Sequence, residues 1–151
     1  MFRKMNFEEV YKWFLRNKNH YKNPEFKYVY DCICHPQRNV EETFYVVVKD
    51  DKIVHMTKVW LQHKSIWLDV LTNAHCISST HPDYRQKGYA TIALEEFVKD
   101  SIGTLIEMSS YTEFGYKTIK ETINRFCELH KVDLNDGEIN SNKTLINYSK
   151  F

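Results

Sequence analysis

The sequence predicts a mixed α/β domain in which a mostly antiparallel sheet, containing one parallel pair of strands, is flanked by helices. Strands in the first half of the chain are separated by short turns, and strands joined in this way are antiparallel. Later, a strand, an amphipathic helix and a further strand follow one another, which implies a parallel pair. The 151 residues, 42% hydrophobic and 27% charged, fit a single globular domain covering residues 1–151.

Composition excludes several classes of protein. Glycine is scarce, with four residues in the chain, which excludes collagen-like and Gly-rich linker proteins. The 21 Lys and Arg residues balance the 20 Asp and Glu residues, which argues against a nucleic-acid partner. No segment approaches the roughly 20 apolar residues of a membrane helix, and the start lacks the apolar stretch of a signal peptide. We therefore expect a cytoplasmic protein.

The first forty residues are predicted to form a helix and a strand. Asn6 is a suitable helix cap, and Glu9 follows it at the spacing of a capping box. Apolar residues then recur at helical spacing: Phe7, Val10, Tyr11, Phe14 and Leu15. The segment Phe26–Cys34 alternates and predicts a strand, in which Cys32 and Cys34 share one face.

The middle of the chain predicts a hairpin and two further strands. Thr43–Lys49 is rich in β-branched and aromatic residues, which favours a strand. Asp50-Asp51 is a turn signal, and Lys52–His63 returns as the second strand of the hairpin. Short strands are also predicted over Ile66–Leu71 and Ala74–Thr80.

In the last half, helices and strands alternate. His81–Gly88 is a polar loop, and Tyr89–Ser101 follows it as an amphipathic helix. Thr104–Ser109 is a strand that completes the βαβ unit. Tyr116–His130 is predicted as a second amphipathic helix, and Thr144–Lys150 as the closing strand.

The polar loop has the residue types of an anion-binding site. A helix N-terminus presents unpaired N–H groups and the positive end of the helix dipole. Gly88 lets the backbone approach a ligand closely, Arg85 and Lys87 add positive charge, and Ala90 keeps the first turn small. The alternative interpretation is a solvated loop in which the glycine only shapes a turn.

The segment Arg85-Gln86-Lys87-Gly88-Tyr89-Ala90 resembles the acetyl-CoA-binding signature of the GNAT N-acetyltransferase superfamily, Arg/Gln-x-x-Gly-x-Gly/Ala. The hairpin Tyr45–Val54 resembles the second and third strands of that family, and Asn124–Val132 resembles its last helix. The resemblance covers about Glu42–Phe151. The first forty residues match less clearly, and extra length around Leu61–Thr72 departs from the family pattern.

The resemblance implies a GNAT-like fold and an acetyl-CoA-dependent N-acetyltransferase that acts on a primary amine. It implies a pyrophosphate-binding segment that acts largely through backbone N–H groups: Arg85, Gln86, Lys87, Gly88, Tyr89, Ala90 and Thr91. Ser78 and Thr80, near the end of the preceding strand, would pair with the pantetheine arm. The thioester would lie where this strand separates from Thr104–Ser109.

The implied reaction requires a proton acceptor, because a lysine-like amine has a pKa of about 10.4 and is protonated at pH 7. His75 lies on the strand that would bind the cofactor, and an imidazole with its ordinary pKa of about 6.5 suits a general base. Asp69 and His55 are weaker candidates. The alternative is that His75 is an ordinary strand residue that packs or faces solvent.

The leaving thiolate of coenzyme A would be protonated by a nearby acid. The family often places a tyrosine on its last helix for this step, and the aligned residue in this chain is Cys127. A thiol, with an ordinary pKa of about 8.5, can donate a proton to a thiolate, but Cys127 can equally be a packing residue. Tyr111 and Tyr116 are alternative donors.

Cys127 in place of the tyrosine keeps open a second class of function, a non-catalytic acyl-CoA-binding or protein-interaction domain on the same fold. We expect acetyl-CoA and an amine acceptor as partners, neither a membrane nor a nucleic acid, and leave a homodimer open. We expect no metal, because the Cys and His residues that could serve as ligands lack the spacing of a zinc motif. These candidates are Cys32, Cys34, His35, His75 and Cys76.

Overall fold

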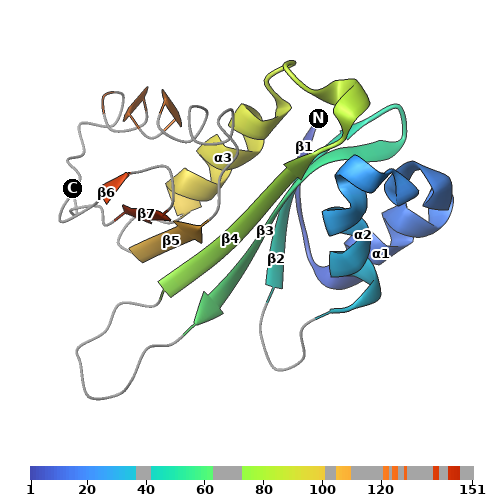
Figure 1. Ribbon diagram of the computed structural model, residues 1–151, viewed down its shortest axis with the longest axis horizontal. Coiled ribbons are helices and arrows are strands. Elements are labelled where there is room, and N and C mark those ends of the chain that lie inside the picture. Colours follow the sequence, from blue (N-terminus) through green and yellow to red (C-terminus); the bar gives the residue numbers. More distant parts are fainter. Residues whose placement is uncertain are drawn as a thin grey trace. The chain divides into compact units, whose positions relative to one another are not determined.

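The structure, a computed structural model, describes residues 1–36, 42–62, 73–100, 105–109, 121–122, 124–125, 128, 138–139 and 143–146 (Figure 1). Contacts group the chain into two compact units. The first comprises Met1–Val59 and Ile77–Ala93, and the second comprises Trp60–Cys76 and Leu94–Phe151. The predicted mixed α/β class is confirmed, whereas the single domain stays a prediction. None of the helices in the described part of the chain combines the length and the apolar character needed to cross a membrane.

The sheet of the first unit begins with a strand that the sequence analysis did not predict. β1 (Phe2–Met5) pairs antiparallel with β2 (Glu42–Lys49), so that Phe2 lies opposite Val47. The terminal ammonium of Met1 extends this pairing by donating a hydrogen bond of 3.0 Å to the carbonyl of Val48.

The predicted hairpin is confirmed. β2 is followed by β3 (Lys52–Gln62), and the two residues between them have positive φ, 53° at Asp50 and 59° at Asp51. Two consecutive left-handed residues form the type I′ turn that matches the twist of a hairpin. Arg16 and Asn17 hold this turn, because their side chains donate hydrogen bonds to the Asp51 carboxylate (3.3 Å) and carbonyl (3.2 Å).

The first helix forms as predicted. α1 (Phe7–Arg16) is capped by Asn6, whose side-chain oxygen accepts a 2.9 Å hydrogen bond from the Glu9 N–H. The Glu9 carboxylate in turn accepts from the Asn6 N–H at 3.4 Å. Val10 and Phe14 are the buried residues of this helix, and α1 packs against β2 (Figure 1).

The strand predicted over Phe26–Cys34 is wrong, because this segment forms a helix. Two short 3₁₀ helices, η1 (Lys18–Lys22) and η2 (Pro24–Phe26), lead into α2 (Lys27–Cys34). The buried residues recur at a spacing of three to four: Phe26, Val29, Cys32 and Ile33. Cys32 is therefore buried and Cys34 exposed, rather than both lying on one face. Most residues of this short run are apolar or aromatic. Such a run fits both the two-residue repeat of a strand and the 3.6-residue repeat of a helix.

The predicted βα junction is also confirmed. β4 (Asn73–Thr80) is followed by a single 3₁₀ turn, η3 (Pro82–Tyr84), and then by α3 (Tyr89–Asp100). Ala93, Leu94 and Phe97 are buried in α3 and belong to the apolar face that the sequence predicts.

The second unit contains the parallel pair. β4 pairs with β5 (Leu105–Ser109) in parallel, and β5 pairs antiparallel with β7 (Lys143–Ile146). β6 (Glu138–Ile139) pairs antiparallel with β7. The predicted strand Ile66–Leu71 lies outside the described residues. Of the predicted helix over 116–130, the five described residues are helical, and Arg125 forms an ion pair with Glu95 of α3.

Candidate functional site

The backbone of the loop after β4 is shaped by two left-handed residues. Gln86 has a φ of 61° and Gly88 a φ of 81°. The Gly88 carbonyl accepts a 3.1 Å hydrogen bond from the Ile92 N–H, so Gly88 occupies the cap position of α3. A Cβ on Gly88 would meet no atom of the described residues within 4 Å. The requirement for glycine is thus conformational, and the space beside its backbone is open.

The start of α3 offers unpaired hydrogen-bond donors. Tyr89, Ala90 and Thr91 precede the first residue whose N–H bonds within the helix. Within the part of the chain that the structure describes, no side chain accepts a hydrogen bond from these three N–H groups. A glycine has no side chain that could cap them. The donors are therefore available to an anion, and the helix dipole favours one there.

Two lysines lie beside this helix start. The Lys87 ammonium is 5.6 Å from the centre of the Tyr84 ring, and the Lys49 ammonium is 5.9 Å from that of Tyr89. A hydrogen bond to Tyr89 raises the pKa of Lys49, so this group is a cation at neutral pH. Lys49 was not predicted as a site residue. It ends β2, some forty residues earlier in the chain, and only the folded hairpin brings it to α3.

The Arg85 side chain is bound by protein groups. Its Nε donates to the carbonyl of Thr80 at 3.2 Å. Its two terminal nitrogens donate to the Glu25 carboxylate and carbonyl, each at 3.4 Å. Arg85 therefore ties the loop to the end of β4 and to η2. A role for its charge in binding phosphate, as predicted, remains a prediction.

The hydroxyls of Ser78, which is exposed, and of Thr80, which is half-buried, contact buried polar side chains of β3. Thr80 Oγ1 lies 2.7 Å from His55 Nδ1, and Thr57 Oγ1 lies 3.0 Å from Ser78 Oγ. His55 of β3 contacts Thr80 of β4, and Thr57, two residues later in β3, contacts Ser78, two residues earlier in β4. The two strands are therefore antiparallel. Contact of either hydroxyl with a pantetheine arm stays a prediction.

A pair of stacked histidines lies next to the loop. The rings of His20 and His81 are 4.3 Å apart with an interplanar angle of 10°. His20 Nε2 donates to the Ile53 carbonyl at 2.8 Å, and His81 Nδ1 accepts from the Asp83 N–H at 3.2 Å. Burial lowers the pKa of both imidazoles, so both are neutral at pH 7. Neutral stacked rings pack without repulsion and hold η1 against the start of η3.

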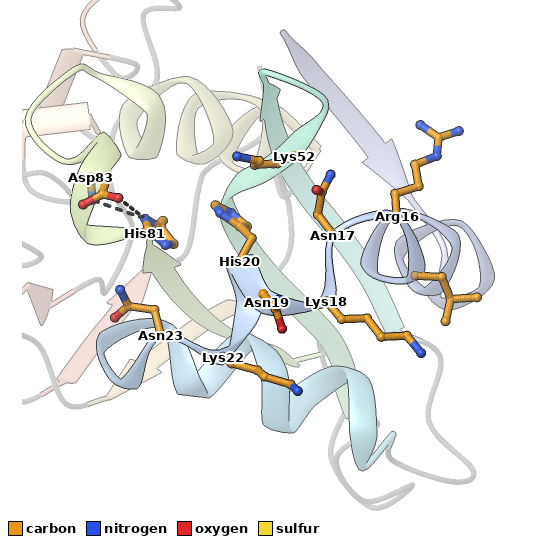
Figure 2. A pocket seen from close by; sticks show the side chains of 11 residues that line it. Arg16, Asn17, Lys18, Asn19, His20, Lys22, Asn23, Lys52, His81 and Asp83 are labelled. Atoms are coloured by element: carbon orange, nitrogen blue, oxygen red, sulfur yellow. Dashed lines mark hydrogen bonds and ion pairs between the residues drawn. The ribbon is translucent and has the colours of Figure 1, made fainter.

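An open pocket of about 900 Å³ adjoins these histidines (Figure 2). Its lining is mostly polar and basic: Leu15, Arg16, Asn17, Lys18, Asn19, His20, Lys22, Asn23, Lys52, His81 and Asp83. Figure 2 shows Lys18 and Lys22 extending away from the imidazole of His20. The cations do not converge on one point, so the pocket lacks the geometry of a tight anion site.

The predicted catalytic residues lie largely beyond what the structure describes. His75 is on β4, opposite Glu107 of β5, and its side chain is not among the described ones. Cys127, Tyr111, Tyr116 and Asp69 all lie outside the described residues. Their roles stay predictions. Among the described residues, no group of His, Cys, Asp and Glu has the arrangement of a metal site.

No protein-family model matches the chain, and no curated protein matches its sequence. Solved structures that match it include GNAT-family acetyltransferases. An acetyltransferase of the GNAT family from Streptococcus pneumoniae is 7% identical, with 99% of this chain and 97% of that chain covered and a TM-score of 0.45. A ribosomal-protein-alanine N-acetyltransferase from Brucella melitensis is 7% identical, with 100% and 99% covered and a TM-score of 0.47.

A conserved protein of unknown function from Enterococcus faecalis V583 is 13% identical, with 78% of this chain covered and a TM-score of 0.47. This chain spans 30% of the length of that protein. These TM-scores lie below 0.5, so function has to be inferred from the site of this chain itself.

Proposed function

We propose that this chain is an acetyl-CoA-dependent N-acetyltransferase of the GNAT type, which transfers an acetyl group to a primary amine. The observation that carries the proposal is the start of α3. Gly88 caps the helix in a left-handed conformation, and the N–H groups of Tyr89–Thr91 are left without a protein acceptor among the described residues. This local structure coincides with the segment Arg85–Ala90 that resembles the acetyl-CoA signature.

The proposed cofactor role of the loop follows from its charge and its donors. A pyrophosphate carries negative charge and several acceptor oxygens, which suit consecutive backbone N–H groups at a helix start. Lys49, beside the ring of Tyr89, and Lys87, directly before Gly88 and beside the ring of Tyr84, add positive charge. The open space beside Gly88 leaves room for a ligand to approach the backbone.

Bound acetyl-CoA would supply the thioester. In the proposed reaction the amine nitrogen attacks the thioester carbonyl, a C–N bond forms, and the C–S bond breaks as the oxyanion collapses. His75 would accept the proton of the attacking amine, and Cys127 or Tyr111 would donate a proton to the leaving thiolate. A backbone N–H of β4 would stabilise the oxyanion.

Two measurements on the purified chain test the proposal. Isothermal titration calorimetry with acetyl-CoA should give saturable binding to the wild type. Release of free thiol should then accelerate when members of a library of primary amines are added. Absence of binding in folded protein would contradict the proposal. Binding without thiol release for any amine would favour a non-catalytic acyl-CoA-binding domain.

A separate variant tests the general base. His75→Ala should lower the rate of acetyl transfer and remove the ionisation of a neutral base from the pH–rate profile. The affinity for acetyl-CoA should stay close to that of the wild type. An unchanged rate and an unchanged profile would exclude His75 from the mechanism.

A further inference from the structure

A fully buried histidine lies beside the end of β4. His55, on β3, has no exposed surface. Its Nδ1 lies 2.7 Å from Thr80 Oγ1, and its Nε2 lies 2.8 Å from Thr57 Oγ1 and 3.3 Å from Ser78 Oγ. Both ring nitrogens therefore have hydroxyl partners, and the cluster joins β3 to β4 in the first unit.

This histidine is neutral. Burial lowers its pKa to about 3, because the charged form would lose its hydration. A neutral imidazole has one N–H donor and one acceptor nitrogen, and hydroxyls can both donate and accept. The contacts of His55 can thus be satisfied without a charge. A group that is buried and neutral in this way is unsuited to take a proton from a substrate amine, which argues against His55 as the general base.

Thr80 connects this buried cluster to the loop. Its hydroxyl is bound to His55, and its carbonyl accepts the 3.2 Å hydrogen bond from Arg85 Nε. Arg85 is tied in addition to Glu25 of η2. The left-handed Gln86 follows directly, and Gly88 comes two residues later. One residue at the end of β4 is thus held through its side chain and through its backbone.

We propose that His55 is a positioning residue for the cofactor loop: by holding Thr80, it fixes the carbonyl that anchors Arg85, and with it the backbone that leads to Gly88. The expected effect on acetyl-CoA binding rests on the proposed function, whereas the effect on the loop backbone does not. Removing the imidazole takes away the 2.7 Å contact of the half-buried Thr80 hydroxyl, whereas Thr57 keeps Ser78 as a partner at 3.0 Å. A polar group that loses its hydrogen-bond partner favours rearrangement of the strand end.

The test compares three variants. His55→Leu removes both polar contacts, whereas His55→Gln retains one donor and one acceptor. Val54→Ala, at the neighbouring buried position of β3, destabilises the core without touching the polar cluster. We expect the dissociation constant for acetyl-CoA to rise about tenfold in His55→Leu, corresponding to about 1.4 kcal/mol. Binding should be largely restored in His55→Gln and unchanged in Val54→Ala.

The readouts separate positioning from general stability. Amide ¹⁵N–¹H shifts of Arg85–Gly88, recorded without ligand, should move in His55→Leu and stay near their wild-type values in Val54→Ala. The KM for acetyl-CoA should rise while kcat at saturation stays within about twofold. The inference would be overturned if His55→Leu and Val54→Ala gave the same dissociation constant for acetyl-CoA and the same amide shifts of Arg85–Gly88.

Should His55→Leu fail to fold, Thr80→Val breaks the same contact from the other side with a side chain of similar size. It should weaken acetyl-CoA binding and shift the loop amides in the same direction. Unchanged loop amides in Thr80→Val would contradict the inference. If the folded wild type fails to bind acetyl-CoA, the proposed function is wrong, and the ligand-free loop shifts still decide whether His55 positions the loop.

The pH dependence of binding is a further discriminating measurement. A positioning role does not involve a change of charge, so the wild type and His55→Gln should bind acetyl-CoA with the same pH profile between about pH 6 and 9. An ionisation that is present in the wild type and absent from His55→Gln would show that His55 acts as an acid or base, and would overturn the positioning role.

Discussion

The starts of α1 and α3, both in the first unit, are built in opposite ways. α1 begins at Asn6, and the side chains of Asn6 and Glu9 satisfy each other's backbone N–H groups. α3 is capped by Gly88, which has no side chain, and two lysines lie near N–H groups that have no acceptor among the described residues. The first start is closed by the protein itself. The second is left open among the described residues, which costs helix stability, and a bound anion would offset that cost.

The largest expected effect comes from replacing the glycine at the open start. Gly88→Val places a β-branched residue at a φ of 81°, which such residues rarely adopt, so the loop should change conformation. Acetyl-CoA binding should weaken by a factor of about 100 or more, as expected when two or more hydrogen bonds to a charged group are lost. Calorimetric titration measures this directly.

Gly88→Asn tests the N–H groups separately from the backbone conformation. Asparagine tolerates the left-handed region better than other residues, and its Cβ would meet none of the described residues within 4 Å. Its side chain can, however, accept from the helix N–H groups as Asn6 does in α1, and would compete with an anion there. Binding should therefore fall less than in Gly88→Val and stay below that of the wild type. Wild-type affinity in Gly88→Asn would show that these N–H groups do not bind the cofactor.

Acid should destabilise the fold through its buried histidines. The pKa of His55 is about 3 in the folded state against an ordinary 6.5, so the unfolded chain binds more protons between these values. The free energy of unfolding should fall as the pH is lowered through this window, with a slope approaching about 1.4 kcal/mol per pH unit from this residue. His20 and His81 act in the same direction.

Urea unfolding at a series of pH values between 6.5 and 4 measures this dependence. The slope in His55→Gln should be smaller than in the wild type, because the titrating group is gone. Identical slopes would mean that His55 is protonated as readily in the folded chain as in the unfolded one.

A smaller effect is expected from the lysines at the start of α3. Lys49→Met and Lys87→Met each remove one positive charge and keep most of the apolar side chain. Each should weaken acetyl-CoA binding about fivefold at low salt, and the difference should shrink as ionic strength rises. Lys12→Met, on the exposed surface of α1, is the control and should leave binding unchanged.

The smallest effect on the site is expected at the closed start. Asn6→Ala removes the cap of α1 and should lower the free energy of unfolding by about 1 kcal/mol. Acetyl-CoA affinity should stay at the wild-type value. A loss of affinity comparable to that of the lysine variants would remove the contrast between the two helix starts.

Elements with a local signal could be predicted from the sequence. The capping box at Asn6, the two-residue turn at Asp50-Asp51 and the loop that ends at Gly88 all appear where their residue types indicate. In each case a few neighbouring residues determine the backbone conformation.

Features that depend on distant residues could not be predicted. β1 is a four-residue strand with two charged residues, and its pairing with β2 sets its conformation. The helix α2 was predicted as a strand because its short sequence alternates, whereas its buried residues follow a helical spacing that only the packing reveals. The contacts of Lys49 with Tyr89 and of His55 with Thr80 depend on the hairpin and on the register of β3 against β4.

The most direct test of the open helix start is a titration of ¹⁵N-labelled protein with coenzyme A, followed by two-dimensional NMR. The amides of Gly88–Thr91 should show the largest shifts and saturate together, while those of Phe7–Val10 at the capped start of α1 should not move. Absence of shifts at Gly88–Thr91 under saturating coenzyme A, or equal shifts at the two helix starts, would contradict the assignment of this helix start as the cofactor site.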